Sequence, residues 1–354
     1  MSRISIGGVQ IGEDSKTFFI AELSANHNQN FDLAIRTIEA IAKTGADAVK
    51  LQTYTPDTIT INCKNDYFKI KQNSVWDGQY LYDLYRSAYT PWEWQPKLKE
   101  FAESLGLICF SSPFDTSAVD FLEEIDVPAY KVASFEITDT PLIKYIAGKG
   151  KPVIISTGIA TKEDIEKAIE ACRSMGNEQI VLLKCTSGYP SPLKDLNLSL
   201  IPDLKQKYNV EVGLSDHTMG NIVPIASVAL GASVIEKHVI LDRKLGGPDS
   251  SFSLEPNEFK EMVEQIRLLE DALGKSSYEL TERMVKSREH ARSLFVVEDI
   301  KKGQLFSKEN VRSIRPGYGI HPEMIVDILG KKAREDIKKG TPMLMEYVED
   351  VGLL

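Results

Sequence analysis

Apolar and polar residues follow two different patterns along the chain. Short, almost continuously apolar runs, typical of strands buried on both faces, are separated by longer segments with apolar residues every three or four positions. The short runs lie at 18–24, 46–52, 107–112, 129–134, 152–156, 180–185, 211–215 and 233–238. Helices are predicted after them at 31–44, 92–105, 115–124, 140–148, 161–175, 195–208, 219–230 and 256–273. Eight strand–helix units in series predict an α/β fold, a (β/α)8 TIM barrel rather than an open doubly wound sheet.

Two of the predicted helices begin with recognisable signals. The helix at 161–175 has Thr161 as a candidate cap, and its apolar stripe continues to Met175. The last helix opens at Pro256, and proline is favoured at the first helical position. Residues 2–12 predict a short hairpin that stands outside the eight units.

The connection at 53–90 is unusually long and is rich in tyrosine, phenylalanine and tryptophan. Loops of this length are usually functional lids or disordered, and the aromatic content argues against disorder. We therefore expect the aromatic side chains both to pack against one another and to stack on a sugar ring.

The pattern changes after the last predicted helix, so residues 1–274 are expected to form the barrel domain. Residues 275–290 are polar and charged and suit a linker. Residues 291–354 predict a small β-rich domain, in which the hexapeptide Glu-Asp-Ile-Lys-Lys-Gly occurs at 298–303 and again at 335–340. A segment this small, with few large apolar residues, is marginal alone, and we expect it to dock on another surface.

Composition narrows the classes of function. The 354 residues are 42% hydrophobic and 26% charged, and the net charge of −9 disfavours nucleic-acid binding. No run approaches the roughly 18 consecutive apolar residues that would span a membrane. The cysteines are few and far apart, as expected for a reduced, cytoplasmic enzyme; they are Cys63, Cys109, Cys172 and Cys185.

Polar or ionisable residues occupy the carboxyl ends of all eight predicted strands, where TIM barrels carry their active sites. Lys50, Lys131 and Lys184 lie inside otherwise apolar strands, where a lysine without a partner is costly. Together with the hydroxyl groups that follow the strands, they predict a site for an anion, most simply a phosphate. Isolated structural ion pairs are the less favoured alternative.

Two histidines and one cysteine also end predicted strands. His217 and His238 end adjacent strands and should lie within reach of each other. They suit a divalent ion such as Mn2+, and they suit equally a hydrogen-bonded pair of core histidines. Cys185 is expected to pack as a small apolar side chain rather than act as a thiolate, because no His–Asp arrangement is evident around it. Asp249 follows a predicted turn and could reach a substrate hydroxyl.

In combination, these segments resemble the sialic acid synthase family, and the match covers essentially the whole chain. The matching barrel segments are Ala21-Glu22-Leu23-Ser24-Ala25-Asn26-His27-Asn28, Lys50-Leu51-Gln52, Phe110-Ser111-Ser112-Pro113-Phe114-Asp115, Lys131-Val132-Ala133-Ser134-Phe135-Glu136, Ser156-Thr157-Gly158, Ser215-Asp216-His217-Thr218 and Glu236-Lys237-His238. Arg315-Pro316-Gly317 resembles the antifreeze-like (SAF) domain of that family. The resemblance therefore implies a TIM barrel followed by a small SAF domain at 291–354.

Three segments resemble the pseudaminic acid synthase branch of the family in particular. They are Glu-Leu-Ser-Ala-Asn-His-Asn-Gln, Tyr-Phe-Lys-Ile-Lys followed by Trp-Asp-Gly, and Ser-Ile-Arg-Pro-Gly-Tyr-Gly. The neuraminate branch typically reads Glu-Ile-Gly where this chain has Glu22-Leu23-Ser24, and it typically has Asn at the position of Ser187.

The resemblance implies a reaction. Phosphoenolpyruvate condenses with an open-chain amino-sugar aldehyde and water, through a tetrahedral intermediate and C–O cleavage, to give a nine-carbon ulosonic acid and phosphate. The expected sugar is 2,4-diacetamido-2,4,6-trideoxy-L-altrose, and the expected product is pseudaminic acid. N-acetylneuraminate or legionaminate synthesis, and a class I aldolase with a Schiff base on Lys131 or Lys184, are the alternatives. A sugar-binding protein that has lost catalysis is disfavoured because the ionisable residues remain.

The resemblance also assigns roles by position. Phosphoenolpyruvate would be held by Lys50, Ser112, Lys131, Ser134, Ser187 and Ser215, and the sugar by Gln52, Tyr189 and Asp249. His217 and His238 would bind the metal, most simply Mn2+ with Mg2+ or Co2+ as alternatives, which polarises the aldehyde oxygen. Glu22 would orient the sugar and assist proton transfer, with Glu136 as the other acid–base candidate. Arg315 would come from the SAF domain of the partner subunit in a domain-swapped homodimer.

Overall fold

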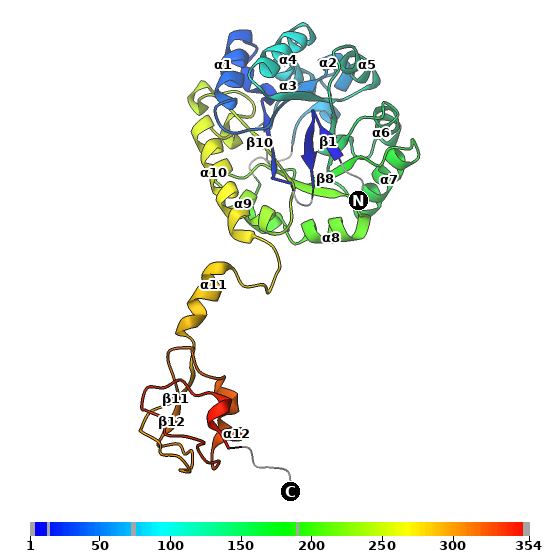
Figure 1. The fold of residues 1–354 in the computed structure, drawn as a ribbon. Helices are drawn as coiled ribbons and strands as arrows, with labels where there is room; N and C mark the ends of the chain where they lie inside the picture. The colour runs from blue at the N-terminus through cyan, green and yellow to red at the C-terminus, as the bar shows by residue number, and fades with distance from the viewer. Residues whose placement is uncertain (1–3, 13–14, 72–75, 189–190, 350–354) are drawn as a thin grey trace. The chain divides into compact units, whose positions relative to one another are not determined.

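The computed structural model describes residues 4–12, 15–71, 76–188 and 191–349. The chain divides into two compact units, Met1–Gly274 and Lys275–Leu354. The first unit is an α/β barrel with its helices on the outside, and the second is a small irregular unit with little regular secondary structure (Figure 1).

The first unit contains a closed barrel of parallel strands, which confirms the predicted TIM barrel. In chain order the strands are β3 (Phe18–Glu22), β4 (Ala48–Thr53), β5 (Ile108–Pro113), β6 (Tyr130–Val132), β7 (Val153–Ser156), β8 (Ile180–Cys185), β9 (Glu211–Asp216) and β10 (Val234–His238). Each strand pairs with its neighbour in the sequence, and β10 pairs with β3 to close the barrel. The eight predicted runs coincide with these strands and differ from them only at their ends.

The helices form a ring around the strands (Figure 1). They are α1 (Phe31–Ile41), α4 (Gln95–Ser104), α5 (Thr116–Glu124), α6 (Thr140–Ala147), α7 (Lys162–Arg173), α8 (Leu200–Tyr208), α9 (Ile222–Ala229) and α10 (Pro256–Leu273). Thr161 caps α7 in a capping box with Asp164, as predicted. The predicted continuation of the apolar stripe to Met175 is wrong, because α7 ends first and Met175 is 49% exposed. Gly176, with φ of 74°, turns the chain at that point.

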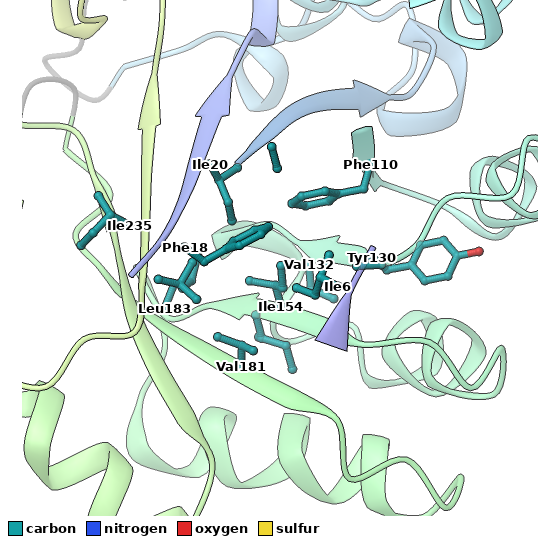
Figure 2. Packing of buried hydrophobic residues seen from close by; sticks show 14 of the residues in the cluster. Ile6, Phe18, Ile20, Phe110, Tyr130, Val132, Ile154, Val181, Leu183 and Ile235 are labelled. Atoms are coloured by element: carbon teal, nitrogen blue, oxygen red, sulfur yellow. The ribbon is translucent and has the colours of Figure 1, made fainter. Parts of the chain in front are cut away.

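The predicted hairpin is present as β1 (Ile4–Ile6) and β2 (Val9–Ile11), which pair antiparallel. The hairpin closes the end of the barrel where the strands begin: a Cβ at Gly7 would meet Ile108, the first residue of β5. Figure 2 shows Ile6 beside Val132 and Ile154 in the apolar core. This core fills the end of the barrel where the strands begin. A ligand would therefore bind at the opposite end, where the strands finish.

The long connection at 53–90 contains helices of its own, α2 (Pro56–Ile59) and α3 (Leu81–Ala88). Tyr54 packs edge-on against Tyr85 and Phe114, with ring centroids 5.6 and 5.1 Å apart. The Trp76 indole Nε1 donates to the carbonyl of Pro248, 3.0 Å away, in the loop that follows β10. The connection therefore packs against itself, as expected, and also reaches a loop at the mouth of the barrel.

The C-terminal unit contains the helices α11 (Glu282–Ser287) and α12 (Ile325–Ile328) and the antiparallel strands β11 (Ser293–Val296) and β12 (Val311–Ile314). Its two hexapeptides pair with each other: the backbone groups of Ile300 and Ile337 exchange two hydrogen bonds of 2.8 Å. Lys301 binds Asp336 at 2.7 Å and, in the mirror position, Lys338 binds Asp299 at 2.8 Å. The two copies of the repeated sequence thus bind each other inside this unit through equivalent hydrogen bonds and ion pairs.

Within the described part of the chain, no helix combines the length and the apolar character needed to cross a bilayer. The four cysteines are free, and Cys109, Cys172 and Cys185 are buried. The α11 helix lies inside 275–290, so the segment predicted as a linker contains one short, exposed helix.

Candidate active site

A cavity of about 520 Å³ opens at the carboxyl ends of the barrel strands. Because side chains alternate along a strand, only every second residue of each strand faces this cavity. On β10 the inward residues are Glu236 and His238, whereas Lys237 between them lies outside and binds Asp216 of β9 at 2.6 Å. The cavity collects nearly all of the predicted barrel residues: Glu22, Lys50, Gln52, Ser112, Lys131, Ser134, Glu136, Ser215, His217, His238 and Asp249.

Two lysines and two glutamates form a buried cluster at the bottom of the cavity. Lys50 Nζ lies 2.9 Å from Glu22 Oε2 and 3.1 Å from Glu236 Oε1, and Lys131 Nζ lies 3.4 Å from Glu236 Oε1. Burial raises the pKa of Glu22, but Lys50, His238 and Lys131 outweigh it and leave this pKa below its usual value. Burial also lowers the pKa of Lys131. The cluster is therefore charged but nearly neutral in sum, with each lysine held by a carboxylate.

Glu236 is the central residue that the sequence analysis did not assign a role. Its Oε1 also accepts a hydrogen bond of 3.0 Å from Ser215 Oγ, so it joins β4, β6, β9 and β10. The sequence holds a usable signal, because Glu236 lies two residues before His238 and must face the same side of the strand.

Lys184 does not join this cluster, which corrects the prediction of three lysines around one mouth. It is the outward neighbour of Cys185 on β8, and its Nζ donates to the Cys185 carbonyl at 2.6 Å and to Thr186 Oγ1 at 3.2 Å. Alternation along β8 places Lys184 on the helix side of the barrel. The anion site that was predicted from lysines therefore rests on Lys50 and Lys131.

Serine hydroxyl groups line one side of the cavity. Ser134 Oγ accepts a hydrogen bond from the backbone N–H of Gly158, 3.2 Å away. A Cβ at Gly158 would lie only 2.2 Å from Ser187 Oγ and 2.6 Å from Ser134 Oγ, so this position requires glycine. Ser156 Oγ and Ser187 Oγ are buried and find no hydrogen-bond partner among the described residues. Hydroxyl and amide groups left in this state are typical of a site that a polar ligand completes.

The two strand-end histidines lie together, as predicted. The ring centroids of His217 and His238 are 5.3 Å apart, and Phe252 packs edge-on against both rings. His238 Nε2 is 3.3 Å from Glu22 Oε2, and His238 Nδ1 is 3.7 Å from Asp249 Oδ2. Burial lowers the pKa of His238, which favours the neutral imidazole that binds metals.

The imidazoles of His217 and His238 suit a divalent metal ion as two nitrogen ligands. His238 Nδ1 is buried and has no hydrogen-bond partner in the described part of the chain, although Asp249 lies near it. Residues 4–12, 15–71, 76–188 and 191–349 contain no cluster of three or more His, Cys, Asp or Glu side chains spaced to hold a metal. A metal at this pair would therefore take further ligands from substrate or water.

Cys185 is buried, as expected, and has a neighbour that the sequence did not indicate. Its Sγ is 4.0 Å from His217 Nδ1 and 3.4 Å from Ser134 Oγ, so a histidine does lie beside it. Burial raises the pKa of the Cys185 thiol, but His217, Ser134 and Lys131 outweigh it and lower this pKa to about 7. Strand pairing explains this neighbour, because it sets Cys185 opposite Ser215, two residues before His217.

Glu136 lies at the rim, in a 3₁₀ turn at Ser134–Glu136 after β6. Burial raises its pKa to about 7, and its Oε2 has no hydrogen-bond partner within the described residues. Tyr54, Tyr85 and Trp76 of the long connection also line the cavity. Tyr189 lies outside the described residues, and Arg315 is an exposed residue of the C-terminal unit.

Comparisons with known proteins agree with this geometry. The sequence profile of the NeuB family matches residues 37–278, and that of the SAF domain matches residues 291–348. Pseudaminic acid synthase from Campylobacter jejuni is 50% identical over 335 residues, which cover 94% of this chain and 97% of that protein. Pseudaminic acid synthase from Helicobacter pylori is 47% identical, with 93% and 97% covered.

A solved structure extends the likeness to three dimensions. The crystal structure of N-acetylneuraminic acid (sialic acid) synthetase from Leptospira borgpetersenii in complex with citrate has a TM-score of 0.73 and 32% sequence identity. The alignment covers 81% of this chain and 95% of that chain. The barrel, the strand-end cluster and the profile match over most of the chain lead to one conclusion: this chain belongs to the NeuB family and carries a C-terminal SAF domain.

Proposed function

We propose that this chain condenses phosphoenolpyruvate with 2,4-diacetamido-2,4,6-trideoxy-L-altrose and water to give pseudaminic acid and phosphate. The observation that carries the proposal is the buried pair Lys50 and Lys131, which opens onto the same cavity as His217 and His238. The two lysines suit the phosphate group of phosphoenolpyruvate, and the two imidazoles beside them suit a metal ion that polarises the aldehyde with which it reacts. The similarity to two pseudaminic acid synthases selects the sugar. Free thiols at all four cysteines suit the cytoplasm as the place of reaction.

Phosphoenolpyruvate binding falls to the lysines and the serine side of the cavity. Lys50 and Lys131 supply charge-assisted hydrogen bonds to the anion, and Glu236 holds both ammonium groups in place before the anion arrives. Ser112, Ser134, Ser187 and Ser215 supply hydroxyl donors. The buried hydroxyl group of Ser187, which lacks a partner among the described residues, gains one when the anion binds.

Two carboxyl groups have different parts in the proposed reaction. C3 of phosphoenolpyruvate forms the new bond to the aldehyde carbon, water supplies the oxygen at C2, and the tetrahedral intermediate loses phosphate by C–O cleavage. Glu136, with a pKa of about 7, is present in both protonation states near neutral pH and can both give and accept a proton. Glu22 stays ionised and, with Gln52, Tyr189 and Asp249, orients the sugar.

Synthases of the NeuB family are generally metal-dependent. In this chain His217 and His238 are the residues that would hold the ion, most simply Mn2+, with Mg2+ and Co2+ as alternatives. A divalent ion bound there supplies a Lewis acid for the aldehyde oxygen. Glu22 and Asp249 lie close enough to His238 to orient its ring.

A second subunit completes the proposed site. Arg315 is exposed in its own unit, and we assign it to the barrel of a partner in a domain-swapped homodimer. Mixing two inactive variants, Lys131→Ala and Arg315→Ala, tests this. Mixed dimers regain activity if Arg315 acts in trans, because one of their two sites is then intact. Unchanged inactivity after subunit exchange, shown by a tagged pull-down, would contradict the assignment.

The test of the reaction is phosphate release from phosphoenolpyruvate with Mn2+. The sugars to compare are the diacetamido-altrose, its manno-configured isomer that legionaminate synthesis uses, and N-acetylmannosamine, each with and without EDTA. Release with the altrose alone, lost with EDTA and restored by metal, supports the proposal. His217→Ala and His238→Ala should abolish metal-dependent turnover while the circular dichroism spectrum stays unchanged.

Other outcomes would move the assignment. Release with N-acetylmannosamine or the manno isomer keeps the family and changes the sugar. A Schiff base trapped by borohydride with pyruvate, together with activity that EDTA does not reduce, would favour a class I aldolase on Lys131. Lys184 is a poor candidate for that role because its ammonium group is bound to the Cys185 carbonyl outside the cavity.

A further inference from the structure

Ser24 has a backbone conformation that its residue type disfavours. Its φ is 46°, in the left-handed region that glycine occupies at no cost. The other described non-glycine residues with positive φ are Asn28, Gln29, Asp126, Asn197 and Asn209. All of these are at least partly exposed, whereas Ser24 is 3% exposed and lines the cavity. Strain of this kind persists where the side chain has a use that glycine cannot supply.

The Ser24 hydroxyl group links two of the residues assigned to the sugar. Its Oγ donates to Asp249 Oδ2 and accepts a hydrogen bond of 3.0 Å from Gln52 Nε2. The Gln52 amide also donates to Glu22 Oε1 at 2.8 Å. Since the Glu22 carboxylate is ionised and can only accept, the orientation of the Gln52 amide is fixed.

Gln52 and Asp249 form one side of the cavity, which we call the sugar wall. The donor and acceptor directions in this chain of hydrogen bonds determine which ligand groups the sugar wall can bind. Both N–H groups of the Gln52 amide are used, by Glu22 and Ser24, so Gln52 presents its Oε1 atom, which is an acceptor. Asp249 keeps its other oxygen, also an acceptor, because Ser24 takes Oδ2. This wall therefore matches ligand groups that donate, which on an amino sugar are hydroxyl and acetamido N–H groups.

The backbone of Asp249 is held separately from its side chain. Asn26 Nδ2 donates to Ser253 Oγ at 2.8 Å, and Ser253 Oγ donates to the Asp249 carbonyl at 2.6 Å. Loss of the Ser24 hydroxyl would leave this anchor intact and free only the carboxylate. The carboxylate lies 3.7 Å from His238 Nδ1 and could then turn towards the imidazole instead of the ligand.

We propose that Ser24 is a positioning residue for sugar specificity, which orients Gln52 and Asp249 as paired acceptors for the donor groups of the amino-sugar aldehyde. The strained backbone at Ser24 is retained because the hydroxyl group is needed there. The inference rests on the proposed function and adds to it the residue that sets the polarity of the sugar wall.

The experiment measures KM for the sugar and for phosphoenolpyruvate in Ser24→Ala and Ser24→Gly. Both variants should raise the sugar KM roughly 10- to 100-fold, as expected for lost hydrogen bonds to a charged group, and leave the phosphoenolpyruvate KM within about twofold. Ser215→Ala, which removes a hydroxyl group assigned to phosphoenolpyruvate, should show the opposite split. Ser227→Ala removes a buried serine hydroxyl from α9 that donates to the Pro224 carbonyl and does not line the cavity, and it should change neither constant.

Thermal unfolding separates strain from recognition. Ser24→Gly, which releases the left-handed strain, should melt roughly 2 °C or more above Ser24→Ala, while both lose sugar affinity alike. If Ser24→Ala fails to fold, Ser24→Gly still gives the KM split. If the variants fold and their sugar KM equals that of the unaltered enzyme, the inference about Ser24 is overturned and the proposed function is unaffected. Absence of phosphate release by the unaltered enzyme with all three sugars would refute the proposed function and, with it, this inference.

Discussion

Two buried ion-pair systems, one outside and one inside the barrel, share the strand β10 and differ in how completely their polar atoms are paired. Outside the barrel, Lys237 donates to Asp216 Oδ2 at 2.6 Å and to the Thr218 carbonyl at 2.7 Å, and Thr218 donates back to Asp216 through its N–H and hydroxyl groups. The side chains of Lys237 and Asp216 are 0% exposed. This pair is closed, because its members satisfy one another.

Inside the barrel, the cluster around Lys50, Lys131 and Glu236 is open. Glu236 Oε2 is buried and lacks a hydrogen-bond partner in the part of the chain that the structure describes. The same holds for two other atoms of the cavity lining, Ser156 Oγ and His238 Nδ1. Buried polar atoms without partners are costly, so a structural cluster would be expected to resemble the outer pair. The difference supports the proposed function, in which the outer pair stabilises the fold and the inner cluster binds phosphoenolpyruvate.

The largest effect is expected from breaking the closed pair. Lys237→Met leaves Asp216 charged and buried without its cation, which should lower the free energy of unfolding by about 3–5 kcal/mol. Urea unfolding followed by circular dichroism measures this loss. The KM for phosphoenolpyruvate of the folded fraction should stay unchanged, since Lys237 faces away from the cavity. A raised KM with normal stability would reverse the roles assigned to the two faces.

Breaking the open cluster should have the opposite signature. Lys131→Ala should weaken phosphoenolpyruvate binding by about 1.5–3 kcal/mol, the range for a hydrogen bond to a charged group. Its effect on unfolding should be smaller than that of Lys237→Met, because Lys50 still balances Glu236 and the cavity can admit water. Titration calorimetry with phosphoenolpyruvate gives the affinity. Equal losses of stability in the two variants would remove the distinction.

The contrast between the two faces also shows what sequence could and could not predict. The barrel follows from eight apolar runs, and the residue types at the strand ends were sufficient to place Lys50, Lys131 and His238 at one mouth. The assignment of Lys184 failed because it ignored the two-residue alternation along β8, and the same oversight left Glu236 without a role.

Other features depend on contacts that no local pattern encodes. Cys185 meets His217 only because β8 and β9 pair in one particular register, which is a property of the closed barrel. Ser24 reads as an ordinary strand-end serine. No local pattern predicts its positive φ, and its link to Asp249 depends on a loop more than 200 residues later in the chain. Such long-range geometry decides the fine structure of the site.

A pH-dependent effect is expected at the rim of the open cluster. The pKa of Glu136 is raised from 4.5 to about 7, so the folded state binds this proton more tightly than the unfolded state. This contribution is fully present below pH 4.5 and is lost as the pH rises through 7. Glu136→Gln should therefore remove a fall in stability of about 1–3 kcal/mol between these limits.

Chemical unfolding at several pH values measures that difference, and pH–rate profiles give an independent view. The unaltered enzyme should show a limb near pH 7 that is missing in Glu136→Gln. Asp139→Asn is a comparison variant that keeps Glu136. It should keep the limb but move it to lower pH, because the charge of Asp139 contributes to the raised pKa of Glu136. A limb that persists without Glu136 would assign it to another group.

The smallest effect is expected where ion pairs are fully solvated. The C-terminal unit repeats one contact twice, Lys301 with Asp336 and Lys338 with Asp299, and all four side chains are more than half exposed. Water and salt screen such pairs, so the double variant Asp299→Asn with Asp336→Asn should shift Tm by less than about 2 °C. Asparagine keeps an oxygen for the backbone N–H groups of Lys302 and Lys339. The opposite result would be a large drop in Tm in the double variant, matched by a similar drop when salt is added to the unaltered protein. It would show that charge, rather than the backbone hydrogen bonds between Ile300 and Ile337, stabilises this unit.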